Sequence, residues 1–102
     1  MSFFIKKEQF NEKILTLSSK EKQKYILEHK KWVQKLRDSG HNLSSGYLIN
    51  NEGNPGGGGI LLLEAKNFEE ARLIIIQDPM IINNLVNWDL QEWIQVAGKA
   101  IY

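Results

Sequence analysis

Residues Ser18–Gly40, SSKEKQKYILEHKKWVQKLRDSG, decide the fold that this sequence predicts. Apolar residues recur there at intervals of three and four, the spacing of one face of an α-helix, while Lys, Glu and Gln fill the opposite face. Ser18 followed by Glu21 is a capping-box pattern and Gly40 supplies a stop, so we expect a helix about 30 Å long. Its apolar stripe contains a histidine and consists of Tyr25, Ile26, His29, Trp32, Val33 and Leu36.

The segments on either side of this helix predict a small sheet. Alternating or continuous apolar residues indicate strands at Phe3–Ile5 with an extension toward Phe10, at His41–Asn50, at Ile60–Leu63 and at Trp88–Val96. Asn11–Leu17 fits neither the helical nor the strand period, and is either a loop or a short helical turn.

A second helix is predicted to begin after Asn67 and to run through EEARLIIIQ. Asn67 is a good N-cap, and Glu70 stands at the capping-box position. The branched run Leu73–Ile76 also suits a strand, but the cap and the acidic first turn favour a helix. Asp78 and Pro79 then end it, because the residue before proline avoids the helical region. The buried face is expected to hold Ala71, Ile74 and Ile75.

The glycine-rich segment Asn50–Gly59, NNEGNPGGGG, resembles a phosphate-binding loop only superficially. No Gly-Lys-Ser/Thr follows it, and the next segment is a strand where a P-loop requires a helix. We therefore expect a flexible hairpin turn. If the protein is an enzyme, this turn would control access to its substrate pocket.

Composition limits the classes of function. The chain of 102 residues suits one domain spanning positions 1–102, and its formal net charge of +1 gives no reason to expect nucleic acid or an anionic membrane as partner. It contains no cysteine and only two histidines, without the spacing of a helical zinc motif, so we expect no metal site. No apolar run is long enough to span a bilayer, and the N-terminus does not resemble a signal peptide, which predicts a cytoplasmic protein.

The order strand, helix, strand, strand, helix, strand predicts an α+β fold. Its simplest arrangement is a ferredoxin-like βαββαβ sandwich, in which both helices cover one face of a four-stranded antiparallel sheet. Several strands are apolar on both faces: Phe3 and Phe4 point in opposite directions, as do Leu61 and Leu62. Each such side chain is worth about 1.5–3 kcal/mol when buried. We therefore predict a homodimer packed sheet against sheet.

His29 and Asp78 are the strongest candidates for catalytic residues. A carboxylate bound to one ring nitrogen of a histidine fixes the tautomer and makes the other nitrogen an acid–base group near neutral pH. Both residues also have structural explanations, since His29 would be a hydrogen-bonded core residue and Asp78 a turn former. Spacing alone does not decide whether the two lie at the same end of the sheet.

The chain resembles the YCII-related (YciI-like) family over most of its length, from about Phe3 to Trp93. The similarity rests on EHKKWVQKLRDSG, on SGYL leading into the glycine-rich segment, and on NFEEARLIIIQDPMI. Its most specific elements are the helix histidine and the Asp-Pro pair after the second helix.

This resemblance implies a dimeric α+β barrel, with His29 and Asp78 as the catalytic pair of a cofactor-free lyase or isomerase acting on a small molecule. Gly46-Tyr47 stands where the family usually has Gly-Pro, and Met80 stands where an aromatic residue often follows Asp-Pro. Substrates of relatives are therefore not transferred to this chain. The candidate pocket residues are Tyr25, Trp32, Ser45, Gly46, Tyr47, Pro79 and Met80. A non-catalytic, dimeric ligand-binding or interaction module of the same fold is the alternative.

Overall fold

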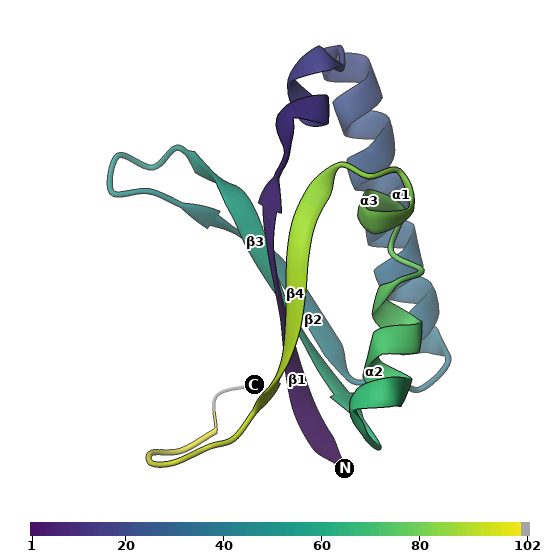
Figure 1. Ribbon diagram of the computed structural model, residues 1–102, viewed down its shortest axis with the longest axis vertical. Helices are drawn as coiled ribbons and strands as arrows, with labels where there is room; N and C mark the ends of the chain where they lie inside the picture. The colour runs from purple at the N-terminus through teal and green to yellow at the C-terminus, as the bar shows by residue number, and fades with distance from the viewer. Residues whose placement is uncertain (101–102) are drawn as a thin grey trace.

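The computed structural model describes residues 1–100 and shows one layer of helices on one sheet (Figure 1). The elements in chain order are β1 (Ser2–Phe10), η1 (Glu12–Thr16), α1 (Ser19–Asp38), β2 (Leu43–Ile49), β3 (Pro55–Ala65), α2 (Phe68–Ile75), α3 (Pro79–Ile82) and β4 (Val86–Trp93). The strand order is β2-β3-β1-β4, and every neighbouring pair is antiparallel. The helices lie on the same side of the sheet. The predicted α+β ferredoxin-like sandwich is confirmed.

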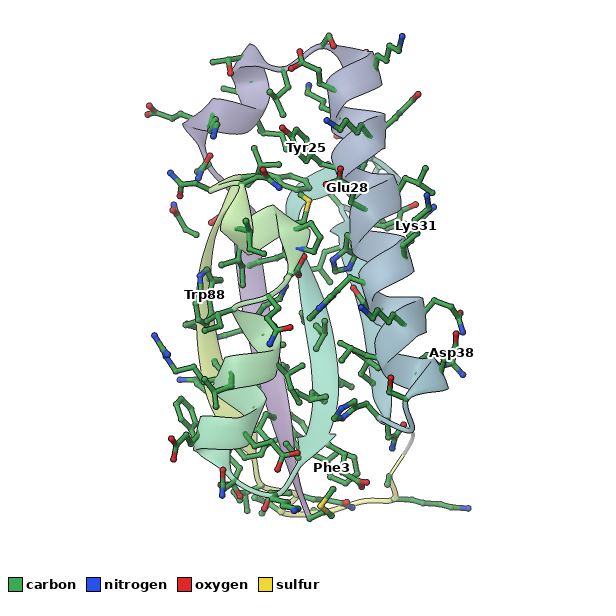
Figure 2. The ribbon with its side chains drawn as sticks, turned by 90° about the vertical axis from the view of Figure 1, so that its right-hand side faces the viewer. Phe3, Tyr25, Glu28, Lys31, Asp38 and Trp88 are labelled. Carbon is green, nitrogen blue, oxygen red and sulfur yellow. The ribbon has the colours of Figure 1, made fainter. Side chains whose placement is uncertain are left out.

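The long helix α1 forms almost where the sequence places it. Ser18 is the N-cap, and its side chain and that of Glu21 complete a capping box. Figure 2 shows Lys31 and Asp38 pointing away from the body of the molecule. No α1 residue is fully buried, because part of its apolar stripe borders a pocket; Ile26 is 43% exposed. None of the helices within residues 1–100 is both long and apolar enough to cross a membrane.

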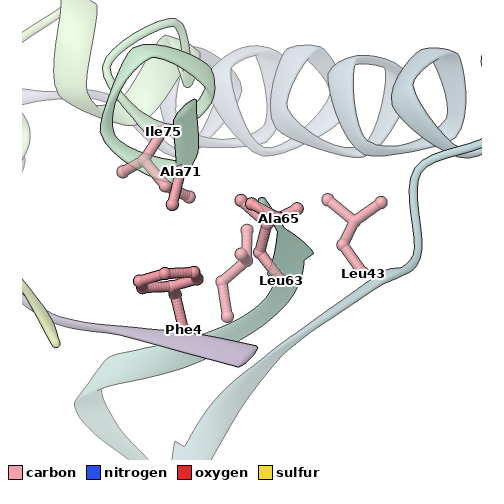
Figure 3. Packing of buried hydrophobic residues seen from close by; sticks show 7 residues of the cluster. Phe4, Leu43, Leu63, Ala65, Ala71 and Ile75 are labelled. Carbon is pink, nitrogen blue, oxygen red and sulfur yellow. The ribbon is translucent and has the colours of Figure 1, made fainter. Parts of the chain in front are cut away.

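Two clusters of apolar residues hold the helices on the sheet. The larger one contains Phe4, Leu43, Leu61, Leu63, Ala65, Ala71 and Ile75 (Figure 3). The smaller one contains Met80, Leu85 and Val86. Between them they use the same face of all four strands, so the helix side of the sheet is filled except where polar residues and glycines occupy it.

The glycine-rich segment is the main error of the sequence analysis. Only the tip near residues 50–54 turns, where the Asn50 carboxamide accepts hydrogen bonds from the backbone N–H groups of Glu52 and Asn54. Residues 55–59 instead belong to β3, and Gly59 pairs with Glu8 on one side and Tyr47 on the other. A Cβ on Gly59 would lie 2.6 Å from the Gly46 carbonyl oxygen. The glycines therefore permit close strand approach instead of forming a flexible turn.

The end of the second helix and the bounds of the last strand also differ from expectation. Helix α2 ends at Ile75, and Asp78-Pro79 does not stop it directly but begins α3, with Asp78 as N-cap and Pro79 in the first turn. The last strand, β4, starts and ends earlier than the predicted Trp88–Val96. Of the two forms left open for the segment before α1, the structure has the short helical turn, which is the 3₁₀ helix η1.

Substituting Gly59 by Ala is expected to destabilise the fold by about 1–3 kcal/mol, because backbone atoms must move to admit the methyl group. The free energy of unfolding in urea is the measurement. Gly46→Ala on the neighbouring strand is the matched control, since a Cβ there meets nothing within 4 Å. Equal stability of the two variants would contradict the close approach of β2 and β3.

Candidate active site

The carboxylate of Asp78 is the centre of a buried hydrogen-bond network. As N-cap of α3, Asp78 accepts the backbone N–H of Met80 at 3.0 Å on Oδ1. The same oxygen lies 2.9 Å from Nδ1 of His29, and Oδ2 accepts from Nζ of Lys6 at 2.7 Å. The side chain of Asp78 is fully buried. A helix start, a strand and α1 therefore converge on one carboxyl group.

His29 connects this carboxylate to the pocket. An ionised carboxylate can only accept hydrogen bonds, so Nδ1 of His29 carries a proton and donates it to Asp78. In the neutral imidazole Nε2 is then the acceptor, and it lies 2.8 Å from Oγ of Ser45, whose hydroxyl donates. The His29 side chain retains 16% exposure, which leaves its outer edge accessible.

Lys6 and Glu8 are members of the network that the sequence analysis missed. Nζ of Lys6 lies 2.8 Å from Oε1 of Glu8, and the Lys6 side chain is fully buried. A signal for both existed in the sequence. At the strand period of two, Lys6 and Glu8 fall on the core-facing side between Phe4 and Phe10, where a charged residue requires a partner.

Opposing effects set the charge of Asp78. Burial alone raises the pKa of its carboxyl group, but the hydrogen bond from His29 and the positive charge of Lys6 outweigh burial and hold the pKa below its ordinary value. Asp78 is therefore a carboxylate at neutral pH.

A pocket of about 590 Å³ opens between α1 and the sheet on the exposed side of His29. It is mainly apolar, with Lys30 and Arg37 of α1 among its lining residues. Of the residues expected to line a pocket, Ser45, Gly46, Tyr47 and Met80 do so with His29. Asp78 lies behind His29 and supports it. Glu8 and Gly57–Gly59 line the pocket as well, and the missing glycine side chains contribute to its space.

Tyr25, Trp32 and Pro79 do not line this pocket, which corrects three expectations. Tyr25 packs against the cluster around Met80, and Trp32 packs against the larger core with its ring 5.8 Å from that of His29. Pro79 occupies the first turn of α3. Within residues 1–100, His, Asp and Glu side chains form no group of three that could hold a metal ion.

Comparisons with known proteins support the fold. No family model matches the chain, and neither does any curated protein sequence. Among solved structures, the chain is similar to 5-chloro-2-hydroxyhydroquinone dehydrochlorinase (TftG) from Burkholderia phenoliruptrix AC1100 in complex with 2,5-dihydroxybenzoquinone. The TM-score is 0.68 at 14% identity, over 92% of this chain and 95% of that one. The chain therefore shares a ferredoxin-like fold with this enzyme. It is also similar to the de novo designed protein Ferredog-Diesel, with a TM-score of 0.57 at 15% identity over 89% of this chain and 84% of that one.

The lowered pKa of Asp78 predicts a pH-dependent contribution to stability. At about pH 7, Asp78→Asn is expected to lower the free energy of unfolding by roughly 3 kcal/mol, because it removes the fully buried charged partner of Lys6 and leaves only Glu8 paired with it. A lowered folded-state pKa stabilises the fold fully above the unfolded value, near 3.8, and this stabilisation is lost as the pH falls through the folded value. The difference from wild type should therefore shrink below about pH 4, as measured by urea unfolding at several pH values.

Asp38→Asn is the matched control, since Asp38 is exposed at the end of α1, where it accepts a hydrogen bond from the Gln34 amide. We expect it to change stability by less than about 0.5 kcal/mol at every pH. An Asp78→Asn difference that stays constant down to about pH 2 would contradict the linkage.

Proposed function

We propose that this protein is a homodimeric, cofactor-independent enzyme of the lyase or isomerase type, related to the YCII family, in which His29 moves a proton on a small molecule. The observation that carries the proposal is the 2.9 Å contact between Nδ1 of His29 and Oδ1 of Asp78 beside an open pocket. The sequence favours a cytoplasmic location for it.

The chemistry follows from the fixed tautomer of His29. With Nδ1–H held by Asp78, Nε2 is the nitrogen available to take a proton from a substrate carbon, and Asp78 stabilises the imidazolium that results. The proton then returns to another atom of the substrate in an isomerisation, or to the leaving group in an elimination. The Ser45 hydroxyl must rotate away from Nε2 when the substrate binds.

The shape and lining of the pocket support a small, largely apolar and cyclic substrate. Phe10, Val33 and Met80 form apolar surfaces, and the glycines of β3 leave room beside Tyr47. The structurally similar dehydrochlorinase acts on a chlorinated hydroxylated ring. This likeness is the reason to include hydroxylated rings among the first compounds tested.

The second face of the sheet supports the proposed homodimer. The strand registers place Phe3, Ile5, Ile60, Leu62 and Trp93 on the face opposite the helices. Trp93 is 45% exposed in the single chain. An apolar face of this extent is typical of a protein interface. Sheet-to-sheet packing of two copies would cover it.

The alternative, a non-catalytic ligand-binding module, is favoured by one observation. The Ser45 hydroxyl is hydrogen-bonded to Nε2 of His29. An acid–base enzyme needs this nitrogen to accept a proton from its substrate. A binding protein could keep this contact and use the pocket walls alone.

Exchange of carbon-bound hydrogen with solvent tests the enzymatic proposal without knowledge of the natural reaction. A panel of hydroxylated rings and small lactones, including 2,5-dihydroxybenzoquinone, is incubated with the protein in D₂O, and loss of C–H signals is followed by NMR. We expect catalysed exchange in at least one compound, and His29→Ala should slow it by roughly a hundredfold or more. His41→Ala is the control, because His41 follows the end of α1 and does not line the pocket. Exchange that persists at the wild-type rate in His29→Ala would refute the role of His29, and absence of exchange throughout the panel would favour the non-catalytic alternative.

The dimer is tested by light scattering at micromolar concentration, with an expected mass twice that of one chain. Leu62→Lys places a charge on the open face of the sheet and should shift the equilibrium to monomers. Leu73→Lys on α2, where the side chain is already 51% exposed, should leave the dimer intact. A monomeric wild type would refute the assembly.

A further inference from the structure

A continuous chain of hydrogen bonds links Ser45, His29 and Asp78. Acid–base chemistry at a substrate carbon uses His29 and Asp78 but does not require Ser45. Oγ of Ser45 lies 2.8 Å from Nε2 of His29, and Nδ1 lies 2.9 Å from Oδ1 of Asp78. We propose that Ser45 is a nucleophile, activated by His29 and Asp78, and that the pocket hydrolyses carboxylic esters or lactones through an acyl-enzyme. The inference rests on the proposed function in one respect, since the same His29–Asp78 pair is the base.

The three side chains have the connections that serine activation needs. The hydroxyl of Ser45 donates to Nε2, so its proton is already directed at the base. The buried Asp78 fixes Nδ1–H, and its own carboxylate is held by the Met80 N–H and by Lys6. A rigid, ionised acid behind the histidine both orients the ring and stabilises the imidazolium.

The strand that carries Ser45 also supplies a donor for the developing oxyanion. The Glu64 N–H donates to the Asn42 carbonyl at 2.9 Å, which makes these two residues a hydrogen-bonded pair. Hydrogen-bonded and non-hydrogen-bonded pairs alternate along antiparallel strands, so Ser45 opposite Leu61 is a non-hydrogen-bonded pair. Its N–H therefore points away from β3, at the outer edge of the sheet, because β2 is an edge strand. The backbone N–H of a nucleophile is a recurring oxyanion donor.

The pocket fits this chemistry. Ser45 and His29 both line it, and its mainly apolar surface suits the hydrocarbon part of an ester or lactone. Ser45 is exposed, so a carbonyl carbon can reach Oγ from the pocket.

Each step balances in atoms and charge. Oγ attacks the carbonyl carbon while its proton moves to Nε2, and the carbonyl oxygen becomes an oxyanion. As the carbonyl re-forms, the bond to the leaving alkoxide oxygen breaks and that oxygen takes the proton from Nε2. Water then attacks the acyl-enzyme with His29 again as base, which releases the carboxylic acid and restores Ser45.

The test is covalent labelling of the intact protein with a fluorophosphonate, together with hydrolysis of p-nitrophenyl butyrate. We expect one adduct, located on Ser45 by peptide mass spectrometry, and ester hydrolysis that the label abolishes. His29→Ala and His29→Gln should slow labelling by roughly a hundredfold or more, with folding of each variant checked by circular dichroism. Ser45→Ala should take no label.

Ser44→Ala is the matched control. Ser44 is the preceding residue on β2, and the strand alternation places its side chain on the opposite face of the sheet. It should label and hydrolyse like wild type. No adduct on Ser45 in folded wild type, or equal labelling in the His29 variants, would overturn the inference. Deuterium exchange at substrate carbon is a separate readout, so labelling can fail while the proposed lyase or isomerase chemistry stands, and the reverse.

Discussion

The carboxylate of Asp78 is the interaction on which the rest of the site depends. A buried charge is tolerated only where it is paired and hydrogen-bonded, and here Lys6, His29 and the start of α3 supply those partners. Each partner comes from a different element. The carboxylate therefore fixes how α1, β1 and α3 are placed relative to one another, in addition to orienting His29.

This constraint explains why the pocket lies where it does. Leu61 and Leu63 fill the helix face of β3 toward one end of the sheet, but glycines replace such residues toward the other end. There part of the apolar stripe of α1 has no sheet side chain to pack on, so Ile26 faces the pocket, and Val33 lines the pocket beside the core. The polar network lies between the filled and the open part of this face, and Ser45 and Glu8 are its two outer members.

A single histidine in this setting supports more than one kind of chemistry. Its outer nitrogen can act on a substrate carbon or on the hydroxyl of Ser45, and both uses need the same buried acid behind it. What separates them is where the substrate carbonyl or C–H group lies relative to Ser45. Binding geometry in the pocket, more than the identity of the acid–base pair, thus determines the reaction.

The sequence by itself determined the local structure. The capping box of α1, the apolar periods of the strands and the order of the elements were sufficient for the fold class, because these depend on residues close together in the chain. The glycine-rich segment was misinterpreted because glycine signals a turn locally, whereas its role here is to let β2 and β3 approach. The family resemblance implied that His29 and Asp78 act together, but only the tertiary structure decided their contact across 49 positions and the pairing of Lys6 with Asp78 across 72. A buried carboxylate is stabilised by the partners that the fold brings next to it. These partners are far apart in the chain, so no local sequence pattern identifies them.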